Sequence, residues 1–245
     1  MYNLEQFSLS EMTACGAAIR KLGRDQTTME ATADQIVRFF YDNFRDPETQ
    51  APTFALARFF KTHDFGELSP PLQAIARDSL GNMPATPSMK CLTLLGTAGD
   101  QPEWNDRAQS TGHQVIPLPS EGMVTQTPMI AQLIQQLGLT INNVIAPASD
   151  MIVDLQERTY NVFHVPQAAN SPYIPAQAEF VEPFQVRSVL GFGGILPSGS
   201  LMAVILFAKA PISRQTAELF KPLALNVKMA VLPFDQGDIF MPRAS

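Results

Sequence analysis

The chain has 245 residues, of which 45% are hydrophobic, so it can bury a sizeable core and is not a disordered protein. Its 17 basic and 23 acidic residues give a net charge of −6, and no run of Lys or Arg occurs, which argues against nucleic acid as a partner. No signal peptide is visible in MYNLEQFSLSE, and the longest apolar stretch, residues 201–208, is too short to cross a bilayer. We therefore expect a cytoplasmic protein without membrane insertion.

Two amphipathic helices are predicted ahead of the first strand. Ser8 and Glu11 have the spacing of a capping box, and apolar residues follow at intervals of three and four at Met12, Cys15, Ile19 and Leu22. Thr27 and Glu30 repeat the capping signature before a second apolar face that extends to Phe44. These faces either pack on the core of the same chain or pair with a second subunit, and the sequence leaves both open.

From Thr53 onward, strands and helices are mixed. Strands are predicted at residues 53–61, 89–96, 113–118, 141–147 and 159–165. Helices are predicted at residues 69–80 and 121–137, the second bent at Pro128, with helical turns at 176–184. Long polar loops at 97–112 and 166–175 are of the kind that often cover binding sites. Together these elements indicate an α+β fold with a largely antiparallel sheet flanked by helices.

The run Gly-Phe-Gly-Gly at residues 191–194 raises the question of a phosphate-binding loop. Such a loop must lead into a helix N-terminus, where free N–H groups meet the anion. Here the chain continues extended, turns at Pro197-Ser198-Gly199-Ser200 and enters an apolar run of strand length at 201–208. We therefore predict an antiparallel hairpin whose glycines mark the close approach of another backbone or a ligand.

The closing segment is predicted to be a helix over residues 213–232, kinked by Pro222 or beginning there, and ended by Pro233. We expect three parts: a helical region at 1–50, the main domain at 51–234 and a flexible tail at 235–245.

The last 60 residues or so resemble the GAF domain family. The similarity lies in AEFVEPF, the strand Val-Arg-Ser-Val-Leu at 186–190, the PSGS turn, LMAVILFA and the closing AELFKPLALNVKMAV. In MKCLTLLG, TYNVFHVP and SPYIPAQAEFV the whole chain is also similar to N-terminal input regions of bacterial multidomain sensor histidine kinases. This resemblance implies a GAF/PAS-like fold with a six-stranded sheet, a role in two-component signal transduction, and an output kinase or signalling domain as partner.

The family's cofactor signatures are absent, so the cofactor stays unknown. The cyclic-nucleotide signature and the Cys–His pair that holds a bilin are missing, and Cys15 and Cys91 cannot build the three-cysteine arrangement of the methionine-sulfoxide-reducing GAF enzymes. The three histidines, His63, His113 and His164, are too widely spaced to indicate a metal site.

Seven residues are candidate ligand-binding groups: His164, Tyr160, Phe163, Tyr173, Arg187, Trp104 and Arg58. Alternation places His164 on the face of Tyr160, either toward a ligand or at the edge of the core. Trp104 is a lid over a pocket or a plug in the core. Arg58 and Arg187 lie in apparent strands and need a partner, either a carboxylate such as Glu182 or an anionic ligand.

No catalytic constellation stands out, so the leading expectation is a non-enzymatic sensory module. It would bind a small molecule between the sheet and residues 97–182 and transmit the signal through the helices of a homodimer. One alternative is a small-molecule enzyme with a pocket of His164, Tyr160, Tyr173 and Arg187. Another is a dimerisation scaffold without a ligand.

Overall fold

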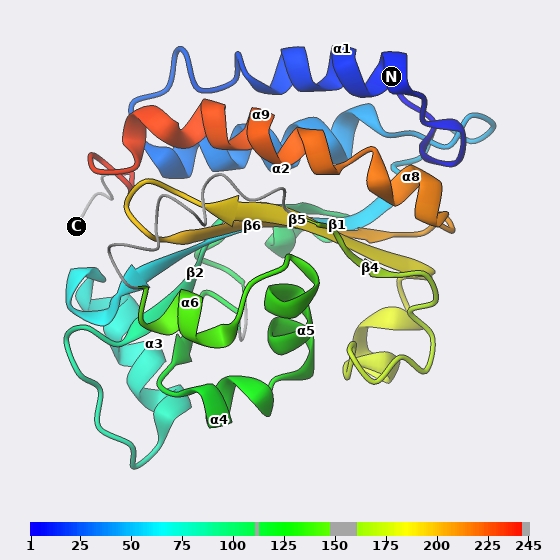
Figure 1. Ribbon diagram of the computed structural model, residues 1–245. Coiled ribbons are helices and arrows are strands. Elements are labelled where there is room, and N and C mark those ends of the chain that lie inside the picture. The colour runs from blue at the N-terminus through cyan, green and yellow to red at the C-terminus, as the bar shows by residue number, and fades with distance from the viewer. Residues whose placement is uncertain (111–112, 148–160, 242–245) are drawn as a thin grey trace.

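A six-stranded sheet runs through the middle of the computed structural model, which describes residues 1–110, 113–147 and 161–241 (Figure 1). The strand order is β3-β2-β1-β6-β5-β4, and every pair of neighbours is antiparallel. The strands are β1 Phe54–Asp64, β2 Lys90–Gly99, β3 Val115–Leu118, β4 Phe163–Val165, β5 Ser188–Ile195 and β6 Leu201–Ala208. The predicted α+β fold, with an antiparallel sheet flanked by helices, is confirmed.

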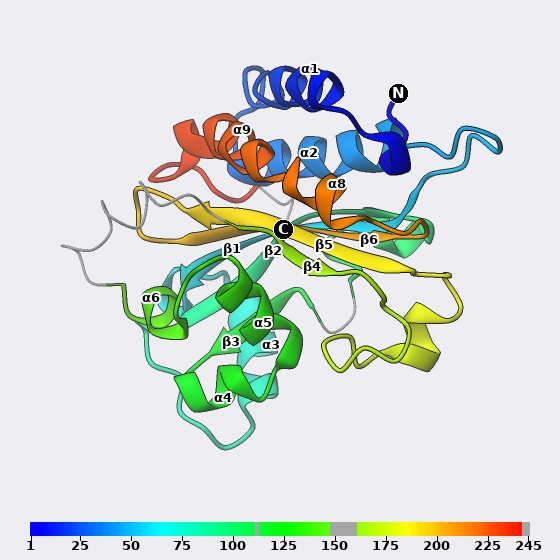
Figure 2. The same ribbon diagram turned by 45° about the vertical axis from the view of Figure 1, so that its right-hand side comes forward.

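The helices from the two ends of the chain cover one face of the sheet. They are α1 Leu9–Ile19, α2 Met29–Asn43, α8 Arg214–Glu218 and α9 Lys221–Val231. In Figure 2, α2 and α9 lie on the sheet and α1 forms an outer layer above them. Ser8 forms the predicted capping box with Glu11, whereas the second helix is capped by Thr28, one residue later than predicted. Pro222 lies in the first turn of α9, so the predicted closing helix is two helices.

The helices from the middle of the chain lie on the opposite side of the sheet (Figure 1). They are α3 Pro70–Leu80, α4 Glu121–Thr125, α5 Pro128–Gln136 and α6 Ile141–Ile145. The short helical turns of the chain are η1 Leu4–Gln6, η2 Phe65–Glu67, η3 Pro102–Asn105, η4 Gln177–Val181 and η5 Leu232–Phe234, of which η1 and η5 pack with the helices from the two ends of the chain. The strand predicted at residues 141–147 is wrong, because Thr140 caps a helix there by accepting a hydrogen bond from the Asn143 N–H. Across the described ranges, no helix combines the length and the apolar character needed to span a membrane.

The apolar stripe of α1 is buried within the chain itself. Cys15 and Ile19 are fully buried in the same core as α2 and α9. Arg20 Nε donates a hydrogen bond to Asn226 Oδ1 of α9 at 2.7 Å, which ties the outer helix to the inner one. On α9, Leu225 stays 59% exposed. The homodimer stays a prediction. The apolar face of α1 that was predicted to contact a second subunit packs against the core of its own chain.

The glycine run does lie in a hairpin, formed by β5 and β6. A Cβ on Gly193 would lie 2.1 Å from the carbonyl oxygen of Met202 on the neighbouring strand. A Cβ on Gly191 would lie 2.9 Å from a Leu133 methyl group of α5. The glycines therefore serve close packing, as the hairpin interpretation predicted, and no helix follows them to bind a phosphate.

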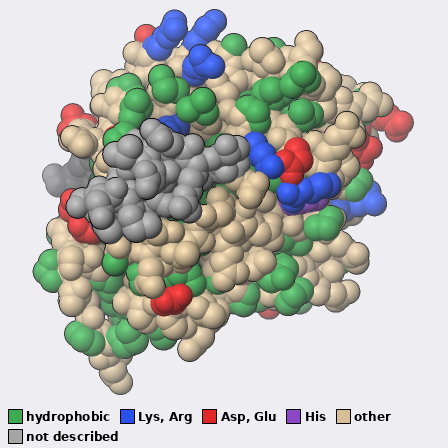
Figure 3. Space-filling model, viewed as in Figure 1, with side chains coloured by type: hydrophobic (Ala, Val, Ile, Leu, Met, Phe, Trp, Pro, Cys, Tyr) green, Lys and Arg blue, Asp and Glu red, His purple; other side chains and the backbone are tan. Residues whose placement is uncertain are grey.

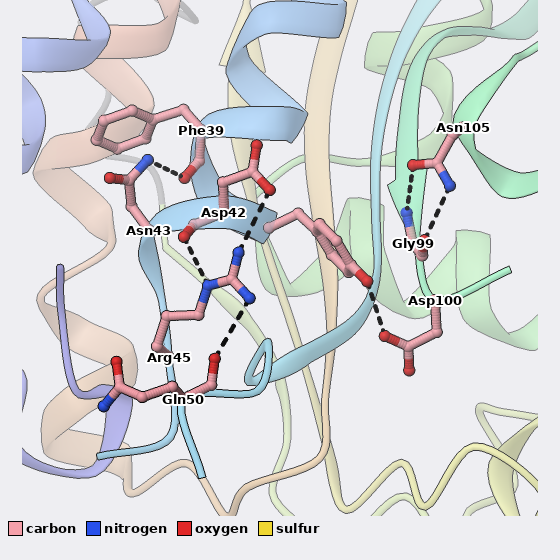
Figure 4. A network of polar contacts seen from close by, with 9 residues as sticks. Phe39, Asp42, Asn43, Arg45, Gln50, Gly99, Asp100 and Asn105 are labelled. Atoms are coloured by element: carbon pink, nitrogen blue, oxygen red, sulfur yellow. Dashed lines mark hydrogen bonds and ion pairs between the residues drawn. The ribbon is translucent and has the colours of Figure 1, made fainter. Parts of the chain in front are cut away.

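The loop after β2 is fastened to its own strand and to α2. The Asn105 side chain accepts from Gly99 N at 3.2 Å and donates to Gly99 O at 2.9 Å (Figure 4). The Tyr41 hydroxyl of α2 donates to Asp100 Oδ1 at 2.9 Å. These bonds fix the direction in which the following residues leave the sheet.

The segment 235–241, expected to be part of a flexible tail, is hydrogen-bonded to the start of α2. Met29 N donates to Asp238 O at 3.0 Å, and Glu30 N donates to Ile239 O at 2.8 Å. In return, Met241 N donates to Glu30 Oε2 at 2.9 Å. The first N–H groups of a helix have no partner inside it, so this segment supplies acceptors that water would otherwise provide.

We predict that Gly193→Ala destabilises the protein by about 1–3 kcal/mol, because the new methyl group must push the backbone of β6 away. Gly122→Ala is the matched control, since no atom lies within 4 Å of the position of its Cβ. Urea unfolding followed by circular dichroism measures both. Equal midpoints for the two variants would contradict the packing role of Gly193.

Candidate functional site

The structure does not bring the predicted ligand-binding residues together. His164 is half-buried, and its Nε2–H donates to the carbonyl oxygen of Ile212 at 2.9 Å. Figure 3 shows a histidine beside acidic and basic side chains near α8, where Arg214, Glu218 and Lys221 form ion pairs. Phe163 is buried on the opposite face, and Arg187 is exposed. Tyr160 lies outside the described residues.

The sheet has a separate hydrophobic core on each face. Two of the predicted aromatic residues, Trp104 and Tyr173, pack against the core on the α5 side. The Trp104 ring lies 4.4 Å from the Phe184 ring and 5.6 Å from the Phe180 ring, measured between centroids. Tyr173 packs against the same core. Trp104 therefore acts as a plug, and Tyr173 lies on the opposite side of the sheet from His164.

Arg58 is also on that side and is 8% exposed. One terminal nitrogen donates to Ser110 Oγ at 3.2 Å, and Nε has no partner. Burial lowers the pKa of Arg58 to about 10. Among the described residues no carboxylate pairs with it, and the expected partner, Glu182, is exposed at the surface.

A cavity of about 660 Å³ lies at the other end of the sheet. Here the end of β1, the hairpin turn before β6 and the segment 235–241 meet. The lining residues are Lys61, His63, Asp64, Glu67, Lys90, Ser198, Ser200, Asp235, Gln236, Gly237, Asp238, Ile239 and Phe240. The residues 97–182, which were expected to border a pocket, contribute none of these.

The register of β1 explains why two basic side chains point into this cavity. Lys61 pairs with Met202 of β6, so Ser200 is its diagonal neighbour on the same face, within reach of a long side chain. His63 lies two residues further along and shares this face. Lys61 and His63 are each 3% exposed. The sequence does carry a signal for this cavity, namely two basic residues at alternate positions of a buried strand, but neither residue was among the predicted ligand-binding groups.

Lys61 is buried without an ion pair in the described part of the chain. Its Nζ lies 3.2 Å from Ser200 Oγ and 3.5 Å from the carbonyl oxygen of Thr62. Burial lowers the pKa of Lys61, while the charges of Asp235 and Glu67 act in the opposite direction. The lysine is thus closer to losing its proton than a lysine at the surface.

His63 is held mainly by packing, with its ring close to the backbone of Lys61. Neither ring nitrogen has a hydrogen-bond partner, and the ring lies 5.2 Å from the Phe240 ring, measured between centroids. Burial, and then the charge of Lys61, lowers the pKa of His63 to about 3. The imidazole is therefore neutral at pH 7, with one nitrogen able to donate and the other able to accept.

Three of the other charged side chains around the cavity, those of Lys90, Asp64 and Asp235, have partners within the chain. Lys90 Nζ lies 2.6 Å from Asp64 Oδ1. Asp235 accepts from Ser198 N at 2.8 Å and from Ser198 Oγ at 2.7 Å. Buried polar groups in proteins nearly always have partners, so the contrast singles out Lys61 and His63 as groups that a bound molecule could satisfy.

Cys15 and Cys91 lie in different cores, and burial raises the pKa of each thiol to about 12. Within residues 1–110, 113–147 and 161–241, no group of three His, Cys, Asp or Glu side chains is placed to hold a metal ion.

Comparison with family models gives no match, and comparison with curated proteins gives none either. Among solved structures, the chain is similar to the X-ray structure of free methionine-R-sulfoxide reductase from Neisseria meningitidis in complex with its substrate. The TM-score is 0.47 at 10% sequence identity, and the match covers 95% of this chain and 97% of that one. Similarity at this level assigns no activity to the present chain.

The expected non-enzymatic input module, with a ligand pocket between the sheet and residues 97–182, is corrected by the structure, because the cavity lies elsewhere and residues 97–182 contribute none of its lining. The alternative pocket of His164, Tyr160, Tyr173 and Arg187 is not assembled either, because His164 and Tyr173 lie on opposite sides of the sheet.

We predict that acidification destabilises the protein through His63. A histidine with a folded-state pKa of about 3 and an unfolded value near 6.5 binds its proton more tightly when unfolded, so its contribution to stability is lost as the pH falls. Between pH 6.5 and 4 this loss amounts to roughly 3 kcal/mol. Urea unfolding at several pH values should show it in the wild type and not in His63→Leu, with His164→Leu as the control. Parallel pH profiles for the wild type and His63→Leu would contradict it.

Proposed function

We propose that the protein is an enzyme that acts on a small polar molecule held in the cavity of Lys61 and His63. The observation that carries the proposal is that both side chains are almost fully buried at the cavity wall without an ionic partner. Burying a charge or a polar group without a partner costs free energy, and such costs are concentrated at functional sites. In this site Lys61 accepts and returns a proton, and the neutral His63 binds the molecule by hydrogen bonds.

The chemistry follows from the electrostatics of the site. A general base works best when its pKa lies near the working pH, and burial moves the pKa of Lys61 in that direction. The imidazole of His63 stays uncharged and therefore does not repel the protonated lysine. The volume of about 660 Å³ suits a metabolite-sized molecule rather than a polymer.

We predict that the wild type, incubated with a mixture of polar metabolites, consumes at least one compound in a time-dependent way, as followed by mass spectrometry. Lys61→Met should abolish this consumption and His63→Leu should reduce it by about tenfold or more. Lys209→Met and His164→Leu are the matched controls, because Lys209 pairs with Asp100 and His164 with Ile212, both remote from the cavity lining. If no compound is consumed, or if Lys61→Met consumes it as fast as the wild type, the proposal is wrong.

The pH profile of the reaction gives a further prediction. The rate should rise as the pH increases through the pKa of Lys61, since only the neutral amine accepts a proton. Glu67→Gln should move this rise to lower pH, because the charge of Glu67 raises the pKa of Lys61. Glu179→Gln, at an exposed site on η4, is the control. A shift in the opposite direction would exclude Lys61 as the base.

A further inference from the structure

Ser200 is the one hydroxyl group at the cavity that hydrogen-bonds to a buried amine in the described residues. Its Oγ lies 3.2 Å from Lys61 Nζ, and its side chain faces the cavity although the residue is only 8% exposed. A hydroxyl group becomes a nucleophile when a base of this kind takes its proton, and Ser–Lys pairs are one known form of such activation.

The backbone of Ser200 is fixed on both sides of the side chain. Ser200 N donates to Ser198 Oγ at 3.3 Å, Leu196 N donates to Ser200 O at 2.9 Å, and Leu201 N donates to Thr62 Oγ1 at 2.9 Å. The last of these bonds connects the turn to β1, the strand that carries Lys61. The distance between the hydroxyl group and the amine is thus set by the hairpin rather than by a flexible loop.

Ser198, two residues earlier, is in a different position. Its hydroxyl group donates to Asp235 Oδ1 at 2.7 Å and also accepts from Ser200 N. Its role is to hold the turn against the segment 235–241. Ser198 is therefore a positioning residue for the turn, whereas the hydroxyl group of Ser200 faces the Lys61 amine.

We propose that Ser200 is a covalent nucleophile activated by Lys61, and that the substrate class is a small carboxylic ester or activated amide. This inference rests on the enzymatic function proposed above for the same cavity. The Ser200 Oγ–H proton passes to the neutral Lys61 amine, Oγ bonds to the carbonyl carbon, and the bond to the leaving group breaks. The leaving alcohol or amine takes the proton from Lys61. Water then attacks the acyl-serine ester, releases the carboxylic acid and restores the Ser200 hydroxyl group.

The exposed carboxylates at the cavity restrict the charge of the substrate. Glu67 and Asp238 are exposed at the cavity, and Asp64 and Asp235 also line it, whereas Lys61 and Lys90 are the lysines of the lining and His63 is neutral. With Lys61 neutral in its reactive form, the site carries an excess of negative charge. It therefore favours neutral or cationic esters over anionic ones.

The test uses an alkyl fluorophosphonate, with which an activated serine forms an Oγ–P bond while fluoride leaves and the proton goes to Lys61. Intact and peptide mass spectrometry should locate one adduct, on Ser200. Ser200→Ala should lose it, and Ser79→Ala, at an exposed serine on α3 that does not line the cavity, should still be labelled. Lys61→Arg should slow labelling about 100-fold or more, because arginine keeps the positive charge but does not accept a proton. Far-UV circular dichroism checks that each variant is folded.

The inference is overturned if Ser200 is not labelled, or if Lys61→Arg is labelled as fast as the wild type. It is also overturned if Ser200→Ala consumes metabolites at the wild-type rate while Lys61→Met does not, and in that case the proposed function stands without the covalent step. Absence of both labelling and metabolite consumption overturns the two together.

Discussion

The central position of β1 is the constraint on which the rest of the molecule depends. This strand pairs with β2 on one side and β6 on the other, and helices cover both faces of the sheet. Ten of its eleven residues are buried as a result, including the polar residues at its end. A lysine or histidine on an edge strand would reach water. On β1 the same side chains are surrounded by other protein groups.

The two buried arginine and lysine side chains of β1 differ in what surrounds them. Arg58 faces the core on the α5 side and donates to Ser110. Lys61 faces the other side, beside a cavity with carboxylates at its wall. The sheet thus separates two buried cations that are three residues apart, and a cavity borders the second of them. Uncompensated charge at an open site is a common cost of function.

Most of the secondary structure could be predicted from the sequence, because caps, prolines and apolar periodicity are local signals. The Ser8 capping box, the break at Pro128 and the hairpin around Pro197–Ser200 all follow from neighbours in the chain. The site could not be predicted in this way, because it joins the end of β1, a turn 139 residues later and the segment 235–241. The candidate histidine, His164, stood out because its strand alternates visibly, whereas His63 was inconspicuous at the end of an apolar run.

The hydrogen bonds between Glu30 and the segment 238–241 have a consequence for biosynthesis. A ribosome delivers the chain from its N-terminus, so α2 emerges well before the residues that complete its first turn, and the contact between Glu30 and Met241 spans 211 residues. Contacts so distant in sequence form late, after long loops have closed. Until then the Lys61 cavity lacks one of its walls, and Arg107, which pairs with Glu30, has no Phe240 ring to stack on. The cavity is therefore complete only after residues 235–241 have been synthesised, and a nascent chain whose first helices have already folded still lacks this wall.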